Sequence, residues 1–304
     1  MKSVVSIIIP VYNRLEITKK GLNYINNSIN HFESSTMSDN TTVKVVVVDD
    51  GSTDGTSEWI QENLPEFTVL NGDGSLWWTG AVNKGIQYCM ENFENLAGVV
   101  LQNDDVILDE TWIFDLIQAA ANNPIALVGC ATSIQEEKHL IYYGGRKLNP
   151  WFAKETKLNF KASRSQFEKG YVTPSFDLYG RGLYIPTEVF KKVGLFDQNS
   201  FKHRGDMDIP LRAKKAGYKL LVSYDAVVYE MPQLTYGLDV KKKITIREAY
   251  KLMTDFRSSN NLRFIYKYSK AATQNELQFF VFFLGNLFYN VRGVSWRLLR
   301  NYIG

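Results

Sequence analysis

Cysteine is scarce in this sequence, which has only Cys89 and Cys130 among its 304 residues. The two do not form the closely spaced pair that a zinc site requires. We therefore expect two buried free thiols, as is typical of proteins in a reducing cytoplasm. Met1-Lys2-Ser3 leads directly into a β-like segment, so we also expect no signal peptide.

Long apolar runs are also lacking, since the aromatic stretch Phe279–Val291 is shorter than the roughly 20 residues of a transmembrane helix. Residues 241–304 around it carry 12 Lys and Arg against 3 Asp and Glu, a net charge of +9, whereas the rest of the chain carries −6. This combination predicts peripheral contact with the inner face of the cell membrane. The alternative is a helix packed on the main domain, with Lys241–Lys243 simply solvated. Phenylalanines suit lipid better than a phosphate backbone, so no nucleic-acid partner is expected.

Two phosphate-binding motifs are missing as well. No G-x-G-x-x-G follows the first expected strand, which argues against a Rossmann-type dinucleotide site. No G-x-x-x-x-G-K-[ST] occurs either, which argues against a P-loop. A diphosphate ligand would therefore need a cation to hold it.

What the chain does have is an alternation of strand and helix signals. Its composition, 45% hydrophobic and 22% charged, is ordinary for a globular protein. Continuous apolar runs predict buried parallel strands, and polar–apolar stretches between them predict helices. The expected strands are Val4–Pro10, Val43–Asp49, Phe67–Asn71, Gly98–Gln102 and Ile125–Ala131. The expected helices are Leu15 to about Asn30, a segment through Trp59 and Ile60 capped by Ser52–Asp54, Thr79 to about Asn92, and Trp112–Asn122. Repeated β–α units predict an α/β fold with a mostly parallel sheet flanked by helices.

Polar, acidic or glycine-rich loops follow four of these strands: Pro10–Arg14, Asp49–Thr56, Asn71–Gly85 and Asn103–Asp105. Parallel α/β sheets bind ligands at the carboxyl ends of their strands, so the four loops together predict one ligand site. The adjacent carboxylates Asp104 and Asp105 suit Mg²⁺ or Mn²⁺, which prefer oxygen ligands and leave positions open for phosphate oxygens. The alternative is that the two residues cap a following turn or helix.

At these residues the chain resembles the family 2 glycosyltransferases, inverting enzymes with the GT-A fold, over about residues 3–230. "SIIIPVYNR" is similar to the opening strand of that family, "VVVVDDGSTDGT" to its nucleotide-binding signature, and Asn103-Asp104-Asp105 to its D-x-D-type metal motif. Gly180–Leu220 resembles the acceptor half, and "LWWTG" resembles members that build rhamnose- or galactofuranose-containing polysaccharides. The resemblance implies a GT-A domain over 1–240, with a nucleotide-sugar-binding half at 1–130 and an acceptor half at 131–240. A basic, aromatic helical tail would follow at 241–304.

The resemblance also implies a role for each matching residue. Tyr12 and Asp50 would contact the nucleotide base, with Asp49 nearby. Asp104 would face the ribose or sugar, and Asp105, with Asp104, would bind Mn²⁺ or Mg²⁺. The donor would be a UDP- or dTDP-linked sugar. The full set of expected donor-binding residues is Pro10, Tyr12, Asn13, Arg14, Asp49, Asp50, Gly51, Trp78, Asn83 and Asp104.

Asp206 falls where the catalytic base of the family sits. Members commonly have an acidic residue just before the base, and this chain has Gly205 there, so Asp208 is the alternative base. Many members also have a His in the region of Glu230 that completes the metal site or touches the diphosphate. Glu230 could offer oxygen to the cation, or it could be a solvated side chain.

Several aromatic and polar residues have both a functional and a structural interpretation. Trp77 and Trp78 could stack on a sugar, and because neighbouring side chains of an extended segment point opposite ways, we expect one of them to face the ligand. Asn83 could position the nucleotide sugar or be solvated on a helix. His203 could contact the acceptor or lie on the surface. Arg181 could bind a diphosphate or form an ion pair.

The reaction implied is a single displacement, in which the base removes a proton from an acceptor hydroxyl and the anomeric configuration inverts. The acceptor would be a glycan or a lipid-linked molecule in bacterial surface polysaccharide synthesis. One alternative is a non-catalytic sugar-nucleotide-binding scaffold, although both Asp206 and Asp208 are present. Another is a sugar nucleotidyltransferase, although Pro10–Arg14 lacks the glycine-rich loop of those enzymes. The sequence leaves the oligomeric state open.

Overall fold

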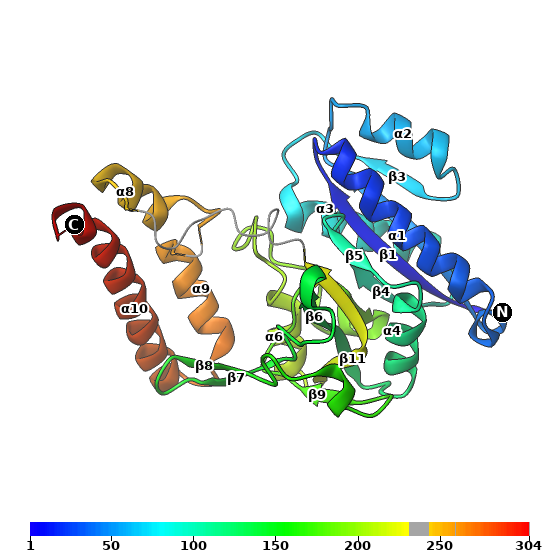
Figure 1. The fold of residues 1–304 in the computed structure, drawn as a ribbon. Coiled ribbons are helices and arrows are strands. Elements are labelled where there is room, and N and C mark those ends of the chain that lie inside the picture. The colour runs from blue at the N-terminus through cyan, green and yellow to red at the C-terminus, as the bar shows by residue number, and fades with distance from the viewer. Residues whose placement is uncertain (231–242, 259, 304) are drawn as a thin grey trace.

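A computed structural model describes residues 1–230, 243–258 and 260–303 of the chain (Figure 1). Lys241 and Lys242, predicted to be solvated, lie outside the described residues. So does the expected domain boundary near residue 240. The division at residue 130 stays a prediction, and it falls inside strand β6.

A single large sheet organises the described part of the chain. Its strand order is β3-β2-β1-β4-β10-β6-β11-β5, and β9 pairs with β11. Strands β1, β2, β3 and β4 are parallel to one another, and β11 is parallel to β6, whereas β5, β9 and β10 run antiparallel to their neighbours. The strands are β1 (Ser3–Val11), β2 (Thr41–Asp49), β3 (Thr68–Asn71), β4 (Leu96–Leu101), β5 (Val106–Leu108), β6 (Ala126–Ile134), β9 (Val172–Pro174), β10 (Leu183–Pro186) and β11 (Lys219–Glu230). The predicted α/β class with a mostly parallel sheet is confirmed.

Helices cover both faces of this sheet because the central strands are apolar on both sides. In β1, Ile7 and Ile9 pack into one core and Ile8 into the other, and all three are fully buried. Helices α1 (Leu15–Glu33), α2 (Thr56–Asn63) and α4 (Trp112–Ala121) supply the first core. Helices α3 (Trp77–Asn92), α5 (Thr187–Val193) and α6 (Asp208–Lys215) supply the second. Both cysteines are buried free thiols, as predicted.

Two helix starts differ from the sequence-based expectation. Helix α3 begins at Trp77, two residues before the predicted start, because the preceding loop is held by Asp50. Helix α2 has Gly55 at its N-cap, with φ +86°, and none of the three expected caps. Asp54 instead closes the preceding turn by accepting hydrogen bonds from the backbone and hydroxyl of Thr56.

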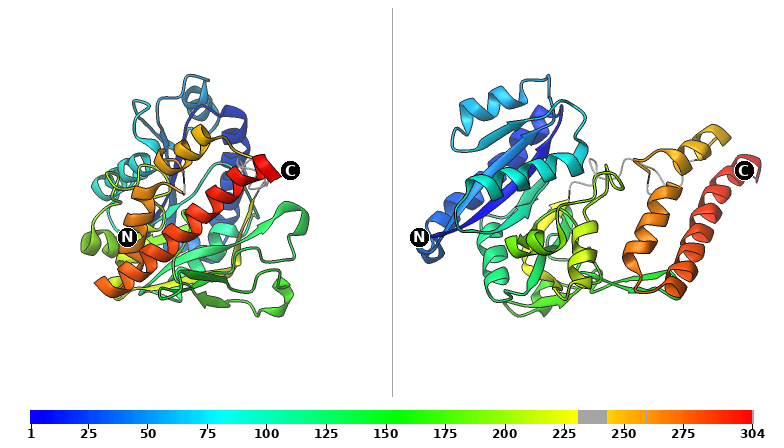
Figure 2. Two further views of the ribbon diagram at one scale, coloured as in Figure 1. Left: turned by 90° about the vertical axis from the view of Figure 1, so that its left-hand side faces the viewer. Right: turned by 180° about the vertical axis from the view of Figure 1, so that it is seen from behind.

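The C-terminal helices stand beside the sheet domain and contact it along a limited face (Figures 1 and 2). They are α8 (Ile246–Thr254), α9 (Leu262–Ala272) and α10 (Glu276–Ile303). Tyr268 of α9 and Phe282 of α10 share a small core with Met207 and Leu211 of the sheet domain. A hairpin of β7 (Arg146–Asn149) and β8 (Lys154–Lys157) reaches from the sheet domain to α10 (Figure 1). Among the described residues, no helix is long and apolar enough to cross a membrane.

Candidate active site

Residues from four separate segments meet in a pocket of about 210 Å³ at the carboxyl edge of the parallel strands. The structure thus brings together four predicted site residues, Trp78, Asp105, His203 and Asp206. The lining residues are Trp78, Asn103, Asp105, Gly180, Arg181, His203, Arg204 and Asp206.

The two adjacent carboxylates after β4 have different roles. Asp104 is fully buried, and its carboxylate accepts hydrogen bonds from Nε of Arg14 at 3.1 Å and from Oγ1 of Thr18 at 2.6 Å. It also forms an ion pair with the Arg14 guanidinium. Burial raises the pKa of Asp104, and Arg14 and Thr18 oppose that rise. Asp104 therefore anchors Arg14 and the first turn of α1, and its donor and metal contacts stay predictions.

Asp105, in contrast, faces the pocket. Its side chain is 20% exposed, and Nη1 of Arg14 lies 3.3 Å from Oδ2. Arg14 therefore joins both carboxylates and does not stand free to bind a donor. No group of three or more His, Cys, Asp or Glu that could hold a metal forms among residues 1–230, 243–258 and 260–303. A cation here would use Asp105 together with phosphate oxygens and water, a donor set that suits Mg²⁺.

Glu230, at the end of β11, is buried and forms an ion pair of 2.9 Å with Arg181. It is therefore not a solvated glutamate. Burial raises its pKa, Arg181 opposes the rise, and the nearby charge of Asp105 adds to it. Arg181 lines the pocket, so it serves both as the partner of Glu230 and as a cation at the site.

The acidic residues after β2 shape the loops around the site. Asp50 is buried and accepts backbone hydrogen bonds from Gly74, Leu76 and Trp77 at 2.9–3.1 Å. Asp49 accepts one from the backbone of Ser52 at 2.9 Å. Asp50 therefore holds the start of α3 in place through three amides, and its contact with the nucleotide base stays a prediction.

The first loop is tied to the second in the same way. The side chain of Asn13 accepts a hydrogen bond of 2.8 Å from the backbone of Thr53. Gly51 has φ +80°, and a Cβ there would lie 3.0 Å from the backbone nitrogen of Gly74, so glycine is required. Pro10 lies in β1, and Tyr12, which follows the end of that strand, is 53% exposed. The contact of Tyr12 with the nucleotide base stays a prediction.

The tryptophan pair opens α3 and does not lie in an extended segment. Trp77 has φ +56°, and its ring packs edge-on against Phe256 at 4.8 Å between centroids. Trp78 turns toward the pocket, where its Nε1 donates to Oδ1 of Asn103 at 3.3 Å. One tryptophan lines the pocket, as predicted. The prediction assumed an extended segment, whereas the two side chains diverge at the start of a helix. Trp77 instead contacts the C-terminal region.

Asn83 is buried on α3, and both polar groups of its side chain form hydrogen bonds with the backbone of Phe196. Its Nδ2 donates to the Phe196 carbonyl at 2.9 Å, and its Oδ1 accepts from the Phe196 amide at 3.0 Å. Asn83 therefore joins α3 to the acceptor half and is not solvated, and its contact with the nucleotide sugar stays a prediction.

Asp206 and Asp208 have contrasting surroundings. Asp208 is buried, pairs with Arg212 at 2.6 Å, and accepts the backbone amide of Asp197 at 2.9 Å. Asp206 lines the pocket and accepts the backbone amide of Gly180 at 3.1 Å. Burial raises the pKa of Asp206, and Asp177 adds to the rise, while the Gly180 amide and Arg181 oppose it. These surroundings favour Asp206 over Asp208 as a base.

The glycine that precedes Asp206 has a steric explanation. A Cβ on Gly205 would lie 2.6 Å from Oγ1 of Thr79 and 3.1 Å from the Phe201 carbonyl. A larger residue therefore requires the Thr79 side chain or the start of α3 to shift. Packing thus disfavours an acidic residue at this position.

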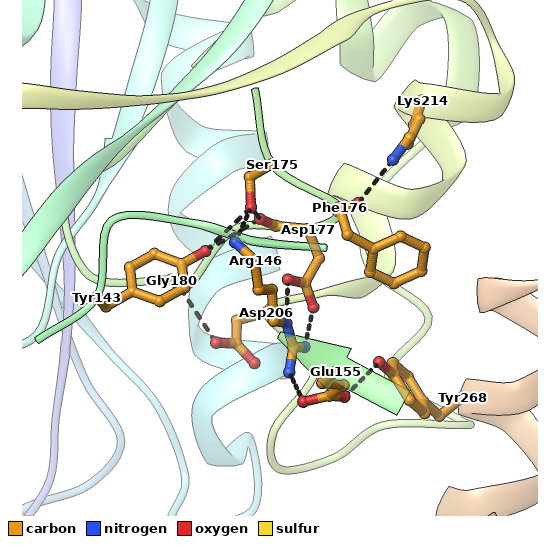
Figure 3. A network of polar contacts seen from close by, with 10 residues as sticks. All are labelled: Tyr143, Arg146, Glu155, Ser175, Phe176, Asp177, Gly180, Asp206, Lys214 and Tyr268. Carbon is orange, nitrogen blue, oxygen red and sulfur yellow. Dashed lines mark hydrogen bonds and ion pairs between the residues drawn. The ribbon is translucent and has the colours of Figure 1, made fainter. Parts of the chain in front are cut away.

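A buried polar network holds the segment that orients Asp206 (Figure 3). Asp177, which is fully buried, pairs with the guanidinium of Arg146 on β7, and Arg146 also pairs with Glu155 on β8 at 2.6 Å. Tyr268 of α9 donates to Glu155 at 3.3 Å. The network therefore connects the C-terminal helices, through the hairpin, to the segment that carries Gly180. The sequence analysis missed Arg146 and Asp177, because no local pattern links them to Asp206.

Comparisons with known proteins identify the family of this chain. The model of glycosyl transferase family 2 matches residues 6–182. An uncharacterized glycosyltransferase of Rickettsia typhi is 27% identical over 210 residues, which cover 67% of this chain and 57% of that protein. An N-acetylglucosaminyl-diphospho-decaprenol L-rhamnosyltransferase of Mycobacterium tuberculosis is 26% identical over 204 residues, 58% of this chain and 62% of that protein. The chain thus spans just over half the length of these two relatives.

A solved structure supports the fold over the whole chain. It is a mannosyltransferase from Pyrobaculum calidifontis in complex with GDP-Man and Mn²⁺, at a TM-score of 0.59 and 15% identity, covering 100% of this chain and 76% of that one. The likeness supports the GT-A architecture that the sequence resemblance implied. Since the family model covers more than half of the chain, this protein belongs to glycosyl transferase family 2.

Proposed function

We propose that this protein is a metal-dependent, inverting glycosyltransferase. It would move a sugar from a nucleotide-diphosphate donor to a hydroxyl of a glycan or lipid-linked acceptor. The observation that carries the proposal is that Asp105 and Asp206, from distant parts of the chain, line one pocket with Trp78. A carboxylate for a cation, a carboxylate for a proton and an aromatic ring for a sugar are what such a transfer requires.

Asp206 is the proposed general base. Its raised pKa brings its proton affinity closer to that of an acceptor hydroxyl, and the Gly180 hydrogen bond holds the carboxylate in one orientation. Asp206 takes the hydroxyl proton as the acceptor oxygen bonds to the anomeric carbon and the bond to the diphosphate breaks. Attack from the face opposite the leaving group inverts the anomeric configuration.

Asp105 is the proposed protein ligand of Mn²⁺ or Mg²⁺. When bound, the cation would stabilise negative charge on the departing diphosphate. Arg181 lies at the same pocket and offers a second positive charge for that diphosphate. The mannosyltransferase of similar fold was solved with Mn²⁺, which supports a divalent cation here.

The donor side of the proposal rests on Tyr12 and Trp78. Tyr12 is exposed just after β1 and can stack on a base, and Trp78 lines the pocket. We propose a UDP- or dTDP-linked sugar, with rhamnose or galactofuranose as candidates. The mycobacterial rhamnosyltransferase among the relatives supports this choice.

The C-terminal helices supply the proposed membrane contact. One stripe of α10 exposes large apolar residues at helical spacing: Leu277, Phe280, Leu284, Phe288, Val291 and Leu299. The region from 241 onward also carries its net charge of +9. An apolar stripe in a basic region suits an anionic bilayer surface, where a lipid-linked acceptor would be found. We therefore place the protein at the cytoplasmic face of the cell membrane, acting in surface polysaccharide synthesis.

A thermal-shift panel of sugar nucleotides, with and without Mn²⁺, tests the donor and the metal together. A ligand that binds only the folded chain raises its melting temperature. We expect at least one UDP- or dTDP-sugar to raise it, and to raise it further with Mn²⁺. If no sugar nucleotide stabilises the protein under either condition, the proposed function is wrong.

A further inference from the structure

A second pocket, of about 290 Å³, lies between the sheet domain and the C-terminal helices. His203 lines this pocket as well as the active-site pocket, so the two are neighbours. One side comes from the segment just before Asp206, and the other from the loop between α8 and α9 and the start of α9. The lining residues are Asn199, Ser200, Phe201, Lys202, His203, Thr254, Phe256, Asn261, Arg263 and Phe264.

The charges of this pocket are of one sign. Lys202 and Arg263 contribute two cations, and none of the ten lining residues is acidic. Arg263 donates to the carbonyl of Asn199 at 3.2 Å, which is a neutral partner. Among the described ion pairs, none neutralises either side chain. Both cations attract an anion that enters the pocket.

The backbone around the pocket also favours a negatively charged ligand. Helix α9 begins here, with Asn261 as its N-cap accepting from the backbone of Phe264 at 3.0 Å. The remaining amides of the first turn point toward the helix N-terminus, where the macrodipole favours negative charge. Phe201, Phe256 and Phe264 supply apolar walls between the charged groups. The pocket is therefore built for an anionic group attached to a less polar body.

We propose that this pocket binds the phosphate or diphosphate group of the acceptor. The inference rests on the proposed transferase function and names a subsite for its second substrate. Lys202 and Asp206 are four residues apart, so their Cα atoms are at most about 14 Å apart. Because His203 lines both pockets, a sugar attached to a phosphate held by Lys202 and Arg263 can extend toward the base. The phosphate could belong to a lipid diphosphate or to a soluble sugar phosphate.

Binding of inorganic pyrophosphate, farnesyl diphosphate and N-acetylglucosamine 1-phosphate to the full chain tests this proposal. Calorimetry in EDTA removes metal-dependent capture at Asp105. Arg181 of the first pocket could still bind a probe, so the second pocket is reported by the difference in affinity between the unaltered chain and a variant of that pocket. The informative variant is Lys202→Ala/Arg263→Ala. We expect its affinity for the probes to fall by roughly tenfold or more, because each lost charge-assisted hydrogen bond is a strong one.

The matched control is Lys20→Ala/Arg247→Ala, which removes one exposed Lys from α1 and one exposed Arg from α8. It should bind the probes as the unaltered chain does. A higher affinity for farnesyl diphosphate than for pyrophosphate supports a lipid acceptor. A higher affinity for N-acetylglucosamine 1-phosphate than for pyrophosphate supports a soluble acceptor. Equal binding by the informative variant and the control overturns the proposal, as does failure of all three probes to bind the unaltered chain.

A UDP thermal shift in Mn²⁺ on the same variants separates this inference from the proposed function. We expect that shift to survive in Lys202→Ala/Arg263→Ala, which also shows that the variant is folded. If the chain binds pyrophosphate through this pocket but no sugar nucleotide, the transferase proposal fails. In that case the acceptor assignment fails with it, although the anion site remains.

Discussion

The backbone amide of Gly180 donates a hydrogen bond of 3.1 Å to Oδ2 of Asp206, across 26 positions of sequence. A Cβ on Gly180 would lie 2.7 Å from the Trp78 ring and 2.9 Å from Cβ of Asp206. Only glycine therefore allows the backbone to approach both side chains. The glycine therefore lets Asp206, the proposed base, and Trp78, the proposed sugar-stacking residue, approach the same backbone position.

The first prediction distinguishes the two candidate bases. Asp206→Asn keeps the shape of the side chain but removes its basic lone pair. We expect turnover to fall by roughly 10²–10⁴, the usual contribution of a positioned base, with donor affinity unchanged. Single-turnover transfer rates and donor titrations measure the two quantities.

Asp208→Asn is the matched control for that experiment. It breaks the ion pair with Arg212 at 2.6 Å, so it should lower the free energy of unfolding by about 1–3 kcal/mol. It should leave turnover of the folded fraction nearly intact. If Asp208→Asn is inactive but stable, while Asp206→Asn works normally, the base has been assigned two residues too early.

The second prediction concerns pH. Burial and Asp177 raise the pKa of Asp206, so the carboxylate becomes ionised only above the usual Asp value of about 3.9. Turnover at saturating donor should therefore fall toward acid at a pH above that value. Arg181 opposes the rise, so Arg181→Gln should move the acid limb to higher pH. A limb that stays in place, or moves to lower pH, would contradict the electrostatic role given to Arg181.

The third prediction separates the paired carboxylates. Asp105→Ala should abolish the Mn²⁺-dependent part of the donor thermal shift, because it removes the proposed protein ligand. Asp104→Asn should keep that dependence but lower the melting temperature, since it breaks a buried pair with Arg14. Transfer that continues undiminished in excess EDTA would remove the metal from the mechanism.

Patterns along the chain predicted five of the nine strands of the large sheet and the helices α1 to α4 between them, because these depend on local periodicity. The antiparallel strands β5, β9 and β10, and β11, were not predicted. The patterns also could not predict which acidic residues face the ligand. Asp50, Asp104 and Asp105 are all aspartates, but their partners differ. Three backbone amides donate to Asp50, whereas the side chains of Arg14 and Thr18 donate to Asp104. Such partners are distant in sequence, so only the folded chain separates structural from functional carboxylates.

The same reason explains the residues that were missed or left open. The position of Asn83 near the start of a helix does not reveal that its side chain bonds to Phe196, which lies far along the chain. Arg146 and Asp177 gave no signal, because an ion pair between a hairpin and a loop has no spacing rule. The two alternatives for His203, acceptor contact or surface, depend on the C-terminal helices, which complete a pocket around it.

The fourth prediction tests the space at Gly205. Gly205→Ala should destabilise the fold, because its Cβ would lie 2.6 Å from Oγ1 of Thr79. Overpacking of this kind costs about 1–3 kcal/mol, measurable by urea denaturation. Thr79→Ala removes the obstructing hydroxyl, so the double variant should recover part of that loss. Purely additive losses in the double variant would argue against the steric explanation.

The last prediction concerns the apolar stripe of α10. Leu284 and Phe288 are one turn apart and 45% and 62% exposed, so replacing them perturbs no core. Leu284→Glu/Phe288→Glu should abolish binding to anionic liposomes, because it places two carboxylates where the stripe would enter the interface. Asn23→Glu/Asn27→Glu, on exposed positions of α1 with the same spacing, adds the same charge away from the stripe and should bind normally. Liposome flotation at low and high salt gives both readings, since the contribution of the basic tail weakens as salt rises. Light scattering on the same samples tests the alternative that a second copy of the protein covers the stripe. A dimer that the α10 variant dissociates, together with no liposome binding by the unaltered chain, would show that the stripe is a dimer interface instead.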